Sequence, residues 1–175
     1  MNDYDYRGCT VTIDQDEFAE NPRDSDCNLG TMLYCHSRYV LGDKQCTPDN
    51  IQDALESFGP DAVVLPLFLY DHSGITMNTT GFACPWYSGQ VGYICVSHDT
   101  IREEYGEVND ESIELATQCL QGEVETFDQY ISGEVYCVKI DFPDGETETL
   151  CGIFGWDYTQ LEVRDMIDAA LDIAA

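Results

Sequence analysis

The sequence predicts a single α+β domain over residues 1–175, in which three or four helices pack on a mainly antiparallel sheet. Three observations predict this class. A chain of 175 residues can bury one sizeable core but is short for two ordinary domains. Short apolar runs predict strands, while apolar positions spaced by three and four predict helices. A Pro-Asp-Gly turn between two expected strands favours antiparallel pairing.

The first 35 residues predict two strands with a loop between them. The apolar run over residues 9–13 is typical of a strand, and so is the run over residues 31–35. Residues 14–29 are polar and show no periodicity, so we expect a long loop there.

A helix is expected after the second strand. Thr47 and Pro48 predict its start, because a capping residue followed by proline is typical of a first turn. Gly59 and Pro60 predict its end. The face expected to be buried consists of Ile51, Ala54, Leu55 and Phe58.

The centre of the chain predicts sheet. Residues 62–70 form an apolar run typical of a strand buried on both faces, and residues 75–78 and 91–97 predict two more strands. From residue 62 to residue 98 the only charged side chain is Asp71, if histidine is counted as neutral. We therefore expect this neutral stretch to form core or an interface.

The C-terminal part predicts three helices and a hairpin. A short helix is expected to start at Asp99 or Thr100 and to end at Gly106, and the last helix is expected over residues 160–173. Between them, a long helix is expected over about residues 110–131, with apolar positions spaced by three and four. The hairpin strands, 134–142 and 148–154, flank the Pro143-Asp144-Gly145 turn.

The chain is strongly acidic, with 34 Asp and Glu against 7 Lys and Arg and a formal net charge of −27. A disordered acidic tail is excluded, because 43% of the residues are hydrophobic and 11% are aromatic. At about 1 M salt the screening length falls to about 3 Å, so the repulsion between these carboxylates largely vanishes. We interpret the charge as adaptation to a saline cytoplasm and expect a halophilic source, such as haloarchaea or their viruses. A protein that mimics the charge of DNA is the alternative.

Several partners and cofactors are not expected. No cluster of Lys and Arg is present, which disfavours direct contact with nucleic acid. No run of 18 apolar residues and no signal pattern occurs, so we expect no membrane contact and a cytoplasmic location in the host cell. None of the nine cysteines forms a C-x-x-C pair, so most are expected to be reduced core residues, among them Cys95 and Cys137. We expect no cofactor.

A zinc site is one alternative role for some of these cysteines. Thiols and an imidazole occur close together in the sequence, and zinc binds both. Their spacing of eight, one and eleven residues fits no common zinc site, so we name no metal ligand. The candidates are Cys27, Cys35, His36 and Cys46.

Residues that could support catalysis follow the expected central strand. Asp71, His72 and Ser73 supply an acid, a base and a hydroxyl, and Cys84 lies in the loop that follows. Neighbouring residues of a strand point to opposite faces, so a turn at Gly74 is the alternative interpretation. We name no catalytic residue and keep these four as candidates for a hydrolase or nuclease centred on His72.

The same neutral stretch is rich in Tyr, Phe, Trp and Gly, a composition typical of contact surfaces between macromolecules. It therefore predicts binding residues rather than catalytic ones. The side chains that we expect to make contact are Tyr70, His72, Trp86, Tyr87 and Gln90.

Several segments together resemble one protein family. They are NLGTM from Asn28, HSRYVLGD from His36, the tract Leu65–Ile94, REEYG from Arg102, GEVETFDQYISGEVY from Gly122 and CGIFG from Cys151. The family comprises small uncharacterised proteins encoded by tailed viruses and mobile elements of bacteria and archaea. The resemblance implies a viral or proviral origin and no particular activity. Members from less saline hosts are less acidic, which assigns the extra charge of this chain to its habitat.

We therefore expect a non-enzymatic accessory protein of a halophilic virus or provirus that binds a host or viral macromolecule, with a protein as the expected partner. Self-association stays open. One alternative is an acidic DNA-mimic inhibitor of a host defence or DNA-processing enzyme. The other is the hydrolase or nuclease centred on His72.

Overall fold

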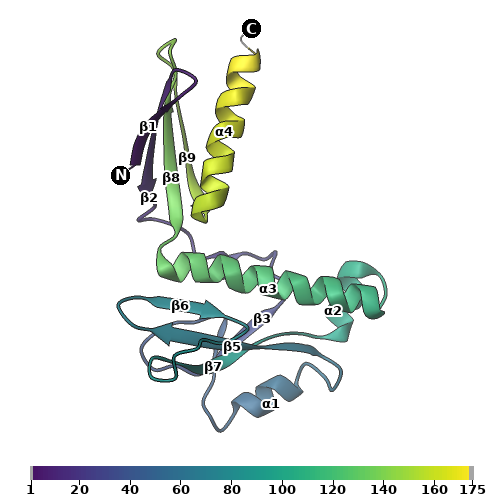
Figure 1. Cartoon of the computed structure of the whole chain (residues 1–175). Helices are drawn as coiled ribbons and strands as arrows, with labels where there is room; N and C mark the ends of the chain where they lie inside the picture. Colours follow the sequence, from purple (N-terminus) through teal and green to yellow (C-terminus); the bar gives the residue numbers. More distant parts are fainter. Residues whose placement is uncertain (1, 174–175) are drawn as a thin grey trace. The chain divides into compact units, whose positions relative to one another are not determined.

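The computed structural model describes residues 2–173 and confirms the α+β class and the mainly antiparallel pairing (Figure 1). The described strands form two sheets, where one was expected. Contacts divide the chain into two compact units. Unit 1 consists of Met1–Asn21 and Gln129–Ala175, and unit 2 consists of Pro22–Asp128. The single domain expected over residues 1–175 stays a prediction.

Unit 1 contains a four-stranded antiparallel sheet in the order β1-β2-β8-β9, and helix α4 lies along one face of it (Figure 1). The β2–β8 pairing joins the N-terminal and C-terminal segments of unit 1, since Thr10 lies opposite Asp141. The core is buried between the sheet and the helix and includes Val11, Ile140 and Ile167. The elements are β1 (Asn2–Tyr6), β2 (Cys9–Gln15), β8 (Val135–Asp141), β9 (Thr147–Phe154) and α4 (Trp156–Ile173).

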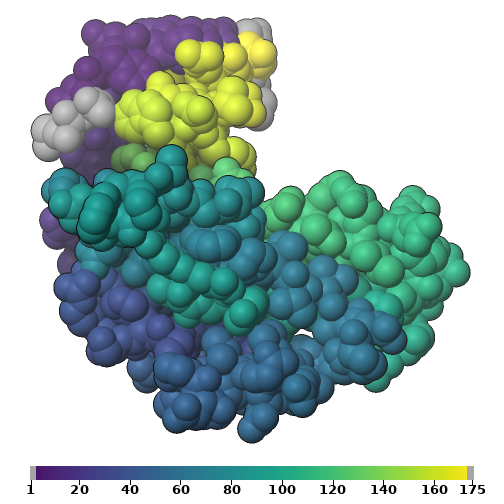
Figure 2. All heavy atoms as spheres, turned by 60° about the horizontal axis from the view of Figure 1, so that its bottom comes forward, coloured from purple at the N-terminus to yellow at the C-terminus, as the bar shows by residue number. Residues whose placement is uncertain are grey.

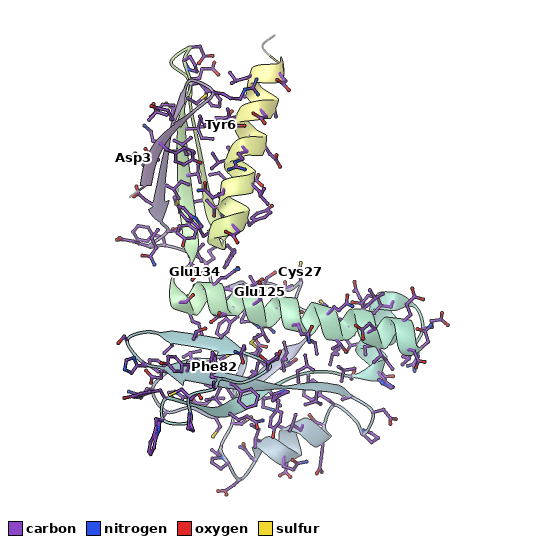
Figure 3. All side chains as sticks on the ribbon, in the orientation of Figure 1. Asp3, Tyr6, Cys27, Phe82, Glu125 and Glu134 are labelled. Carbon is purple, nitrogen blue, oxygen red and sulfur yellow. A yellow bond between two sulfur atoms is a disulfide. The ribbon has the colours of Figure 1, made fainter. Side chains whose placement is uncertain are left out.

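Alternation of side chains explains why the N-terminal segments are strands. In β2, Cys9, Val11 and Ile13 are buried, and the residues between them are more exposed. Strand β1 was not predicted, although its sequence NDYDY alternates in the same way and its two tyrosines pack against the core. Tyr6 lies on the side of α4, where its hydroxyl donates to Asp168 at 3.3 Å (Figure 3).

Unit 2 contains a five-stranded sheet in the order β4-β3-β7-β5-β6, with helices α3 and α1 on opposite faces (Figure 1). The four residues expected to form the buried face of the first helix do pack on Leu33, Cys46 and Cys95, but they are half-buried rather than buried, and Phe58 lies beyond the end of α1. The strands are β3 (Thr31–Tyr34), β4 (Lys44–Gln45), β5 (Val63–Asp71), β6 (Ile75–Asn78) and β7 (Ser88–Val96). The helices are α1 (Ile51–Glu56), α2 (His98–Tyr105) and α3 (Asp110–Ser132), with a 3-10 turn at Pro22–Asp24.

Three expectations about these elements need correction. Helix α1 begins at Ile51 rather than at Thr47, because the preceding residues form a turn in which the Thr47 carbonyl accepts from Asn50 N at 3.1 Å. Strand β5 is not buried on both faces along its length, since Val64 is 40% exposed. Helix α4 begins at Trp156, four residues before the expected start.

The polar stretch after β2 is anchored by a buried arginine. The Arg23 side chain is 3% exposed and makes a bidentate pair with Asp43, at 3.0 and 2.7 Å. It also donates to Glu123 of α3 at 2.6 Å and to the Gly30 carbonyl at 2.6 Å. These acceptors lie outside the loop: Glu123 belongs to α3, and Gly30 and Asp43 directly precede β3 and β4. The Arg23 hydrogen bonds therefore hold the loop against α3 and the sheet of unit 2.

One cysteine expectation is wrong. Cys137 was expected to be reduced, but it forms a disulfide with Cys151, which the β8–β9 hairpin places beside it. The other seven cysteines are free, but only Cys9, Cys46 and Cys95 are buried, so the expectation of a reduced core residue holds for Cys95 and not for most of the nine. Burial raises the pKa of the Cys95 thiol to about 12, so this side chain stays protonated. In residues 2–173 no helix has the length and apolar character to cross a bilayer.

Candidate functional site

Three segments of unit 2 that are distant in sequence meet at one end of its sheet. They are the loop after β3, the end of β5 with its turn into β6, and the loop before β7. Backbone pairing holds the last two together, since Tyr70 lies opposite Ser88 and the Asp71 amide donates to the Tyr87 carbonyl at 2.8 Å. We call this region the aromatic surface; its residues are His36, Arg38, Tyr39, Tyr70, Asp71, His72, Phe82, Trp86 and Tyr87. In Figure 2 the blue-green atoms of the β5–β7 stretch form part of the visible surface of unit 2.

Tyr70 is the centre of a group of rings. Its ring centroid lies 5.6 Å from that of Phe82, which is labelled in Figure 3, and 6.3 Å from that of Tyr87. His72 meets the Tyr87 ring edge to face at 4.4 Å. Such tilted and edge-to-face contacts are the favourable arrangements for aromatic pairs, so the rings hold one another in place.

Asp71 connects the loop after β3 to this group. One carboxylate oxygen pairs with the Arg38 guanidinium, and the other lies 3.5 Å from the Tyr39 hydroxyl. Arg38 also lies over the Tyr39 ring at 5.2 Å, and the other stacking partner of Tyr39 is His36, at 5.0 Å. The Arg38 side chain is 66% exposed, so the ion pair orients the loop more than it stabilises the fold.

The turn between β5 and β6 has an unusual backbone. Ser73 has a φ of 61° and Gly74 a φ of 152°, and the Gly74 carbonyl accepts from His72 N at 3.0 Å. Positive φ is uncommon for any residue other than glycine. The turn therefore confirms the alternative sequence interpretation of a bend at Gly74, and it presents His72 at the surface.

The aromatic surface is exposed and nearly neutral. Trp86 is 87% exposed and Tyr87 is 48% exposed. The charges of Arg38 and Asp71 offset each other. Gln90 is also exposed on β7, where its amide nitrogen donates to the Gly92 carbonyl at 3.3 Å. An exposed indole in a neutral region is typical of a contact surface.

The catalytic candidates are brought together only in part. The Ser73 hydroxyl lies 3.4 Å from Nδ1 of His72. The contacts of the Asp71 carboxylate go to Arg38 and Tyr39 rather than to His72. Cys84 is half-buried, and its carbonyl accepts from the Ser88 hydroxyl at 2.6 Å. The arrangement thus gives His72 a hydroxyl neighbour but places the expected acid with a different partner.

The zinc candidates are also brought together only in part. Cys35, His36 and Cys46 line one open pocket of about 410 Å³, and Cys27 is exposed. Nδ1 of His36 already accepts from the backbone amide of Tyr39 at 3.1 Å. Within residues 2–173, three possible metal ligands do lie close together in unit 1. They are Asp16, Cys137 and Cys151, whose ligand atoms are within 4.8 Å of one another.

Five residues of the aromatic surface were not predicted as binding residues from the sequence: His36, Arg38, Tyr39, Asp71 and Phe82. The first three belong to the HSRYVLGD segment, which was noted for its resemblance, and His36 was otherwise named only as a candidate zinc ligand. Their connection to β5 depends on Asp71, more than thirty residues later, so no local spacing shows it.

Compared with models of protein families, with curated proteins and with solved structures, the chain matches none of them. The resemblance to viral and mobile-element proteins stays a prediction.

Proposed function

We propose that this protein is a non-enzymatic accessory protein of a halophilic virus or provirus, which uses the aromatic surface to bind a host or viral protein. The observation that supports this most is Trp86, an indole that is 87% exposed and that directly precedes Tyr87, a member of the group of packed rings. Interfaces concentrate their binding energy in tryptophan, tyrosine and arginine, all of which this surface contains.

A saline cytoplasm favours such a surface. Proteins adapted to brine are acidic, so two such proteins repel each other where their carboxylates come close. Salt screens this repulsion but does not produce an attraction between them. Contact between apolar rings needs no charge, and salts that are excluded from protein surfaces strengthen it. A neutral aromatic region is therefore the part of this chain best suited to hold an acidic partner.

The two alternatives have less support. A hydrolase centred on His72 would need an acid to orient the imidazole, and Asp71 is paired with Arg38. A DNA mimic is not favoured by any concentration of charge in one part of the chain: unit 1 has 16 acidic and three basic residues, and unit 2 has 18 and four, so the net charges of −13 and −14 are nearly equal.

Capture experiments with matched variants test the proposal. The wild-type protein, Trp86→Ser and Tyr158→Ser would each be used as bait in a haloarchaeal lysate containing about 1 M KCl. Tyr158 is the control, because it is an aromatic residue of unit 1 that is 59% exposed. We expect one protein to be captured in stoichiometric amount by the wild type and by Tyr158→Ser, with roughly tenfold or greater loss of affinity for Trp86→Ser.

Two results would contradict the proposal. One is recovery of the bait alone, as a monomer, from lysates of infected and uninfected cells. The other is a partner that Trp86→Ser holds as tightly as the wild type does, which would place the contact elsewhere on the chain.

A further inference from the structure

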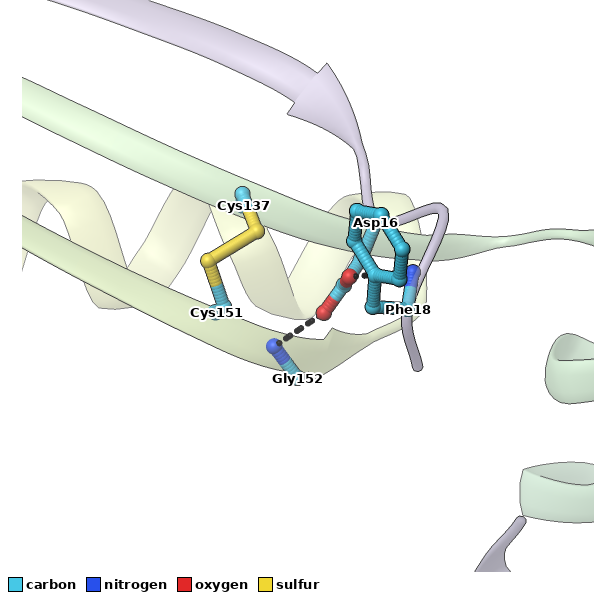
Figure 4. The surroundings of a disulfide bond; sticks show 5 residues. All are labelled: Asp16, Phe18, Cys137, Cys151 and Gly152. Carbon is cyan, nitrogen blue, oxygen red and sulfur yellow. Dashed lines mark hydrogen bonds between the residues drawn. A yellow bond between two sulfur atoms is a disulfide. The ribbon is translucent and has the colours of Figure 1, made fainter. Parts of the chain in front are cut away.

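The disulfide of unit 1 lies at a bulge between two neighbouring strands (Figure 4). Tyr136 lies opposite Ile153 and Val138 lies opposite Leu150, so Cys137 faces both Cys151 and Gly152. Gly152 has a φ of 74°, a conformation that glycine adopts easily. Because ladder pairing on both sides fixes the two cysteines, their sulfur atoms stay close together even when the bond between them is broken.

Asp16 lies beside this disulfide. Its Oδ2 accepts from the Gly152 amide at 3.0 Å, and its Oδ1 accepts from the Phe18 amide at 2.9 Å (Figure 4). A carboxylate offers about four lone pairs, and these two bonds leave about two of them for another partner. The backbone therefore orients Asp16 toward the sulfur atoms without saturating it.

We propose that reduction of this disulfide creates a site for a divalent cation that accepts sulfur ligands, with Zn²⁺ as the best match. The ligands are Sγ of Cys137, Sγ of Cys151 and one carboxylate oxygen of Asp16. The sulfur and oxygen atoms lie within 4.8 Å of one another. Zinc binds thiolates and carboxylates, and three protein ligands with water in the fourth position form one of its common coordination sets.

Reduction of the disulfide and binding of Zn²⁺ are two separate steps, each with a defined source or destination for its electrons and protons. A dithiol reductant gives two electrons and two protons to the disulfide, which yields two thiols and the oxidised reductant. Binding of Zn²⁺ then releases both thiol protons to solvent and leaves two thiolates on the metal. The oxidised protein has neutral disulfide sulfurs in place of thiolates, so it lacks two of the three ligands.

The proposed site is open to solvent, and the residues around it are acidic. Cys151 is exposed, and Cys137 and Asp16 are half-buried, so a reductant and an ion both reach the site. An open groove of about 540 Å³ begins beside it and includes Asp14 and Glu17. These carboxylates add negative potential, which raises the local concentration of cations.

Zinc binding by the whole chain in two redox states tests the inference. One sample would be kept oxidised, and another would be reduced with a phosphine that is then removed; both would be titrated with Zn²⁺ against a chromogenic chelator in molar KCl. We expect the reduced protein to bind one more Zn²⁺ per chain than the oxidised protein. With Co²⁺ as the probe, the reduced protein alone should show a thiolate-to-metal absorption band from this site.

Variants separate this site from the other cysteines. Cys151→Ser should lose the additional Zn²⁺, and Asp16→Asn should bind it at least tenfold more weakly, while keeping an oxygen that accepts a backbone hydrogen bond. Cys27→Ser removes an exposed free cysteine of unit 2 and should bind as the wild type does.

The inference is overturned if both redox states of the wild type bind equal amounts of Zn²⁺, a comparison that needs no substitution. It is also overturned if Cys151→Ser, with a circular dichroism spectrum like that of the wild type, retains the additional ion. Unchanged affinity in Asp16→Asn would exclude Asp16 as the third ligand.

Discussion

Arg23 is the charged side chain whose removal should affect the fold most. It is almost completely buried and meets Asp43 and Glu123, whose carboxylates also accept from the backbone amides of Met32 and Leu29. Taking away one partner of a buried charge network leaves the other charges without compensation, which is strongly destabilising.

We predict that Arg23→Ala lowers the free energy of unfolding by about 3–5 kcal/mol. Denaturant unfolding in molar KCl would measure the change. Arg102→Ala is the matched control, because Arg102 is 57% exposed and pairs with Asp99 one helical turn away. That variant should change the free energy of unfolding by less than about 1 kcal/mol. Equal effects of the two substitutions would contradict a structural role for Arg23.

Arg23 also illustrates which residues the sequence could not explain. It lies in a polar stretch with no periodicity, where a single arginine is normally solvated. Its partners lie 20 and 100 residues further along the chain, so no local pattern connects them. Tyr70, His72, Trp86, Tyr87 and Gln90 were predicted as binding residues because they share one neutral stretch; the aromatic surface contains the first four, and Gln90 lies outside it on β7.

At the scale of elements, Gly92 sets how closely two strands of unit 2 approach. A Cβ atom at this position would lie 2.9 Å from Cα of Tyr34 and closer still to the Leu33 carbonyl oxygen. Both of those atoms belong to the backbone of β3, which pairs with β7 at this point. Only glycine therefore fits without displacing β3.

We expect Gly92→Ala to destabilise unit 2 by at least as much as an overpacked core substitution, about 1–3 kcal/mol. Gly89→Ala, in the same strand, is the control, because nothing lies within 4 Å of the added methyl group. Hydrogen exchange of the β3 amides would distinguish the two variants. Protection that is retained in Gly92→Ala would show that β3 tolerates the methyl group.

Local signals predicted the elements better than they predicted the sheets. The Pro143-Asp144-Gly145 turn and the Gly106 cap of α2 are short-range features, and the elements that they mark are present. Helix α2 begins at His98, after the Ser97 cap, rather than at Asp99 or Thr100 as expected. Strand β4 is two residues long and has no periodicity to detect. The division into two sheets depends on the β2–β8 pairing, which joins segments at opposite ends of the sequence and has no local signature.

At the scale of the whole molecule, the net charge of −27 is shared almost equally by the two units. Screening acts over about 3 Å at 1 M salt and over about 30 Å at 0.01 M. In dilute buffer, each carboxylate therefore interacts with many others, and compact states are destabilised by repulsion.

The protein should accordingly lose compactness when it is dialysed from about 1 M to about 0.01 M KCl. Circular dichroism and size-exclusion chromatography would follow the change, and return to high salt should reverse it. A protein that stays folded and monodisperse in dilute buffer would contradict the assignment of its charge to a saline habitat. The acidic residues would then need a specific target to explain them.

The order of the two units along the chain has a consequence for synthesis on the ribosome. Unit 2 is continuous, from Pro22 to Asp128, and it interrupts unit 1. Strand β2 is made early, but its partner β8 emerges more than a hundred residues later, which takes on the order of ten seconds of translation. Unit 2 thus has its whole sequence available first, and during that interval the nascent β1–β2 hairpin has no partner to cover Val11 and Ile13.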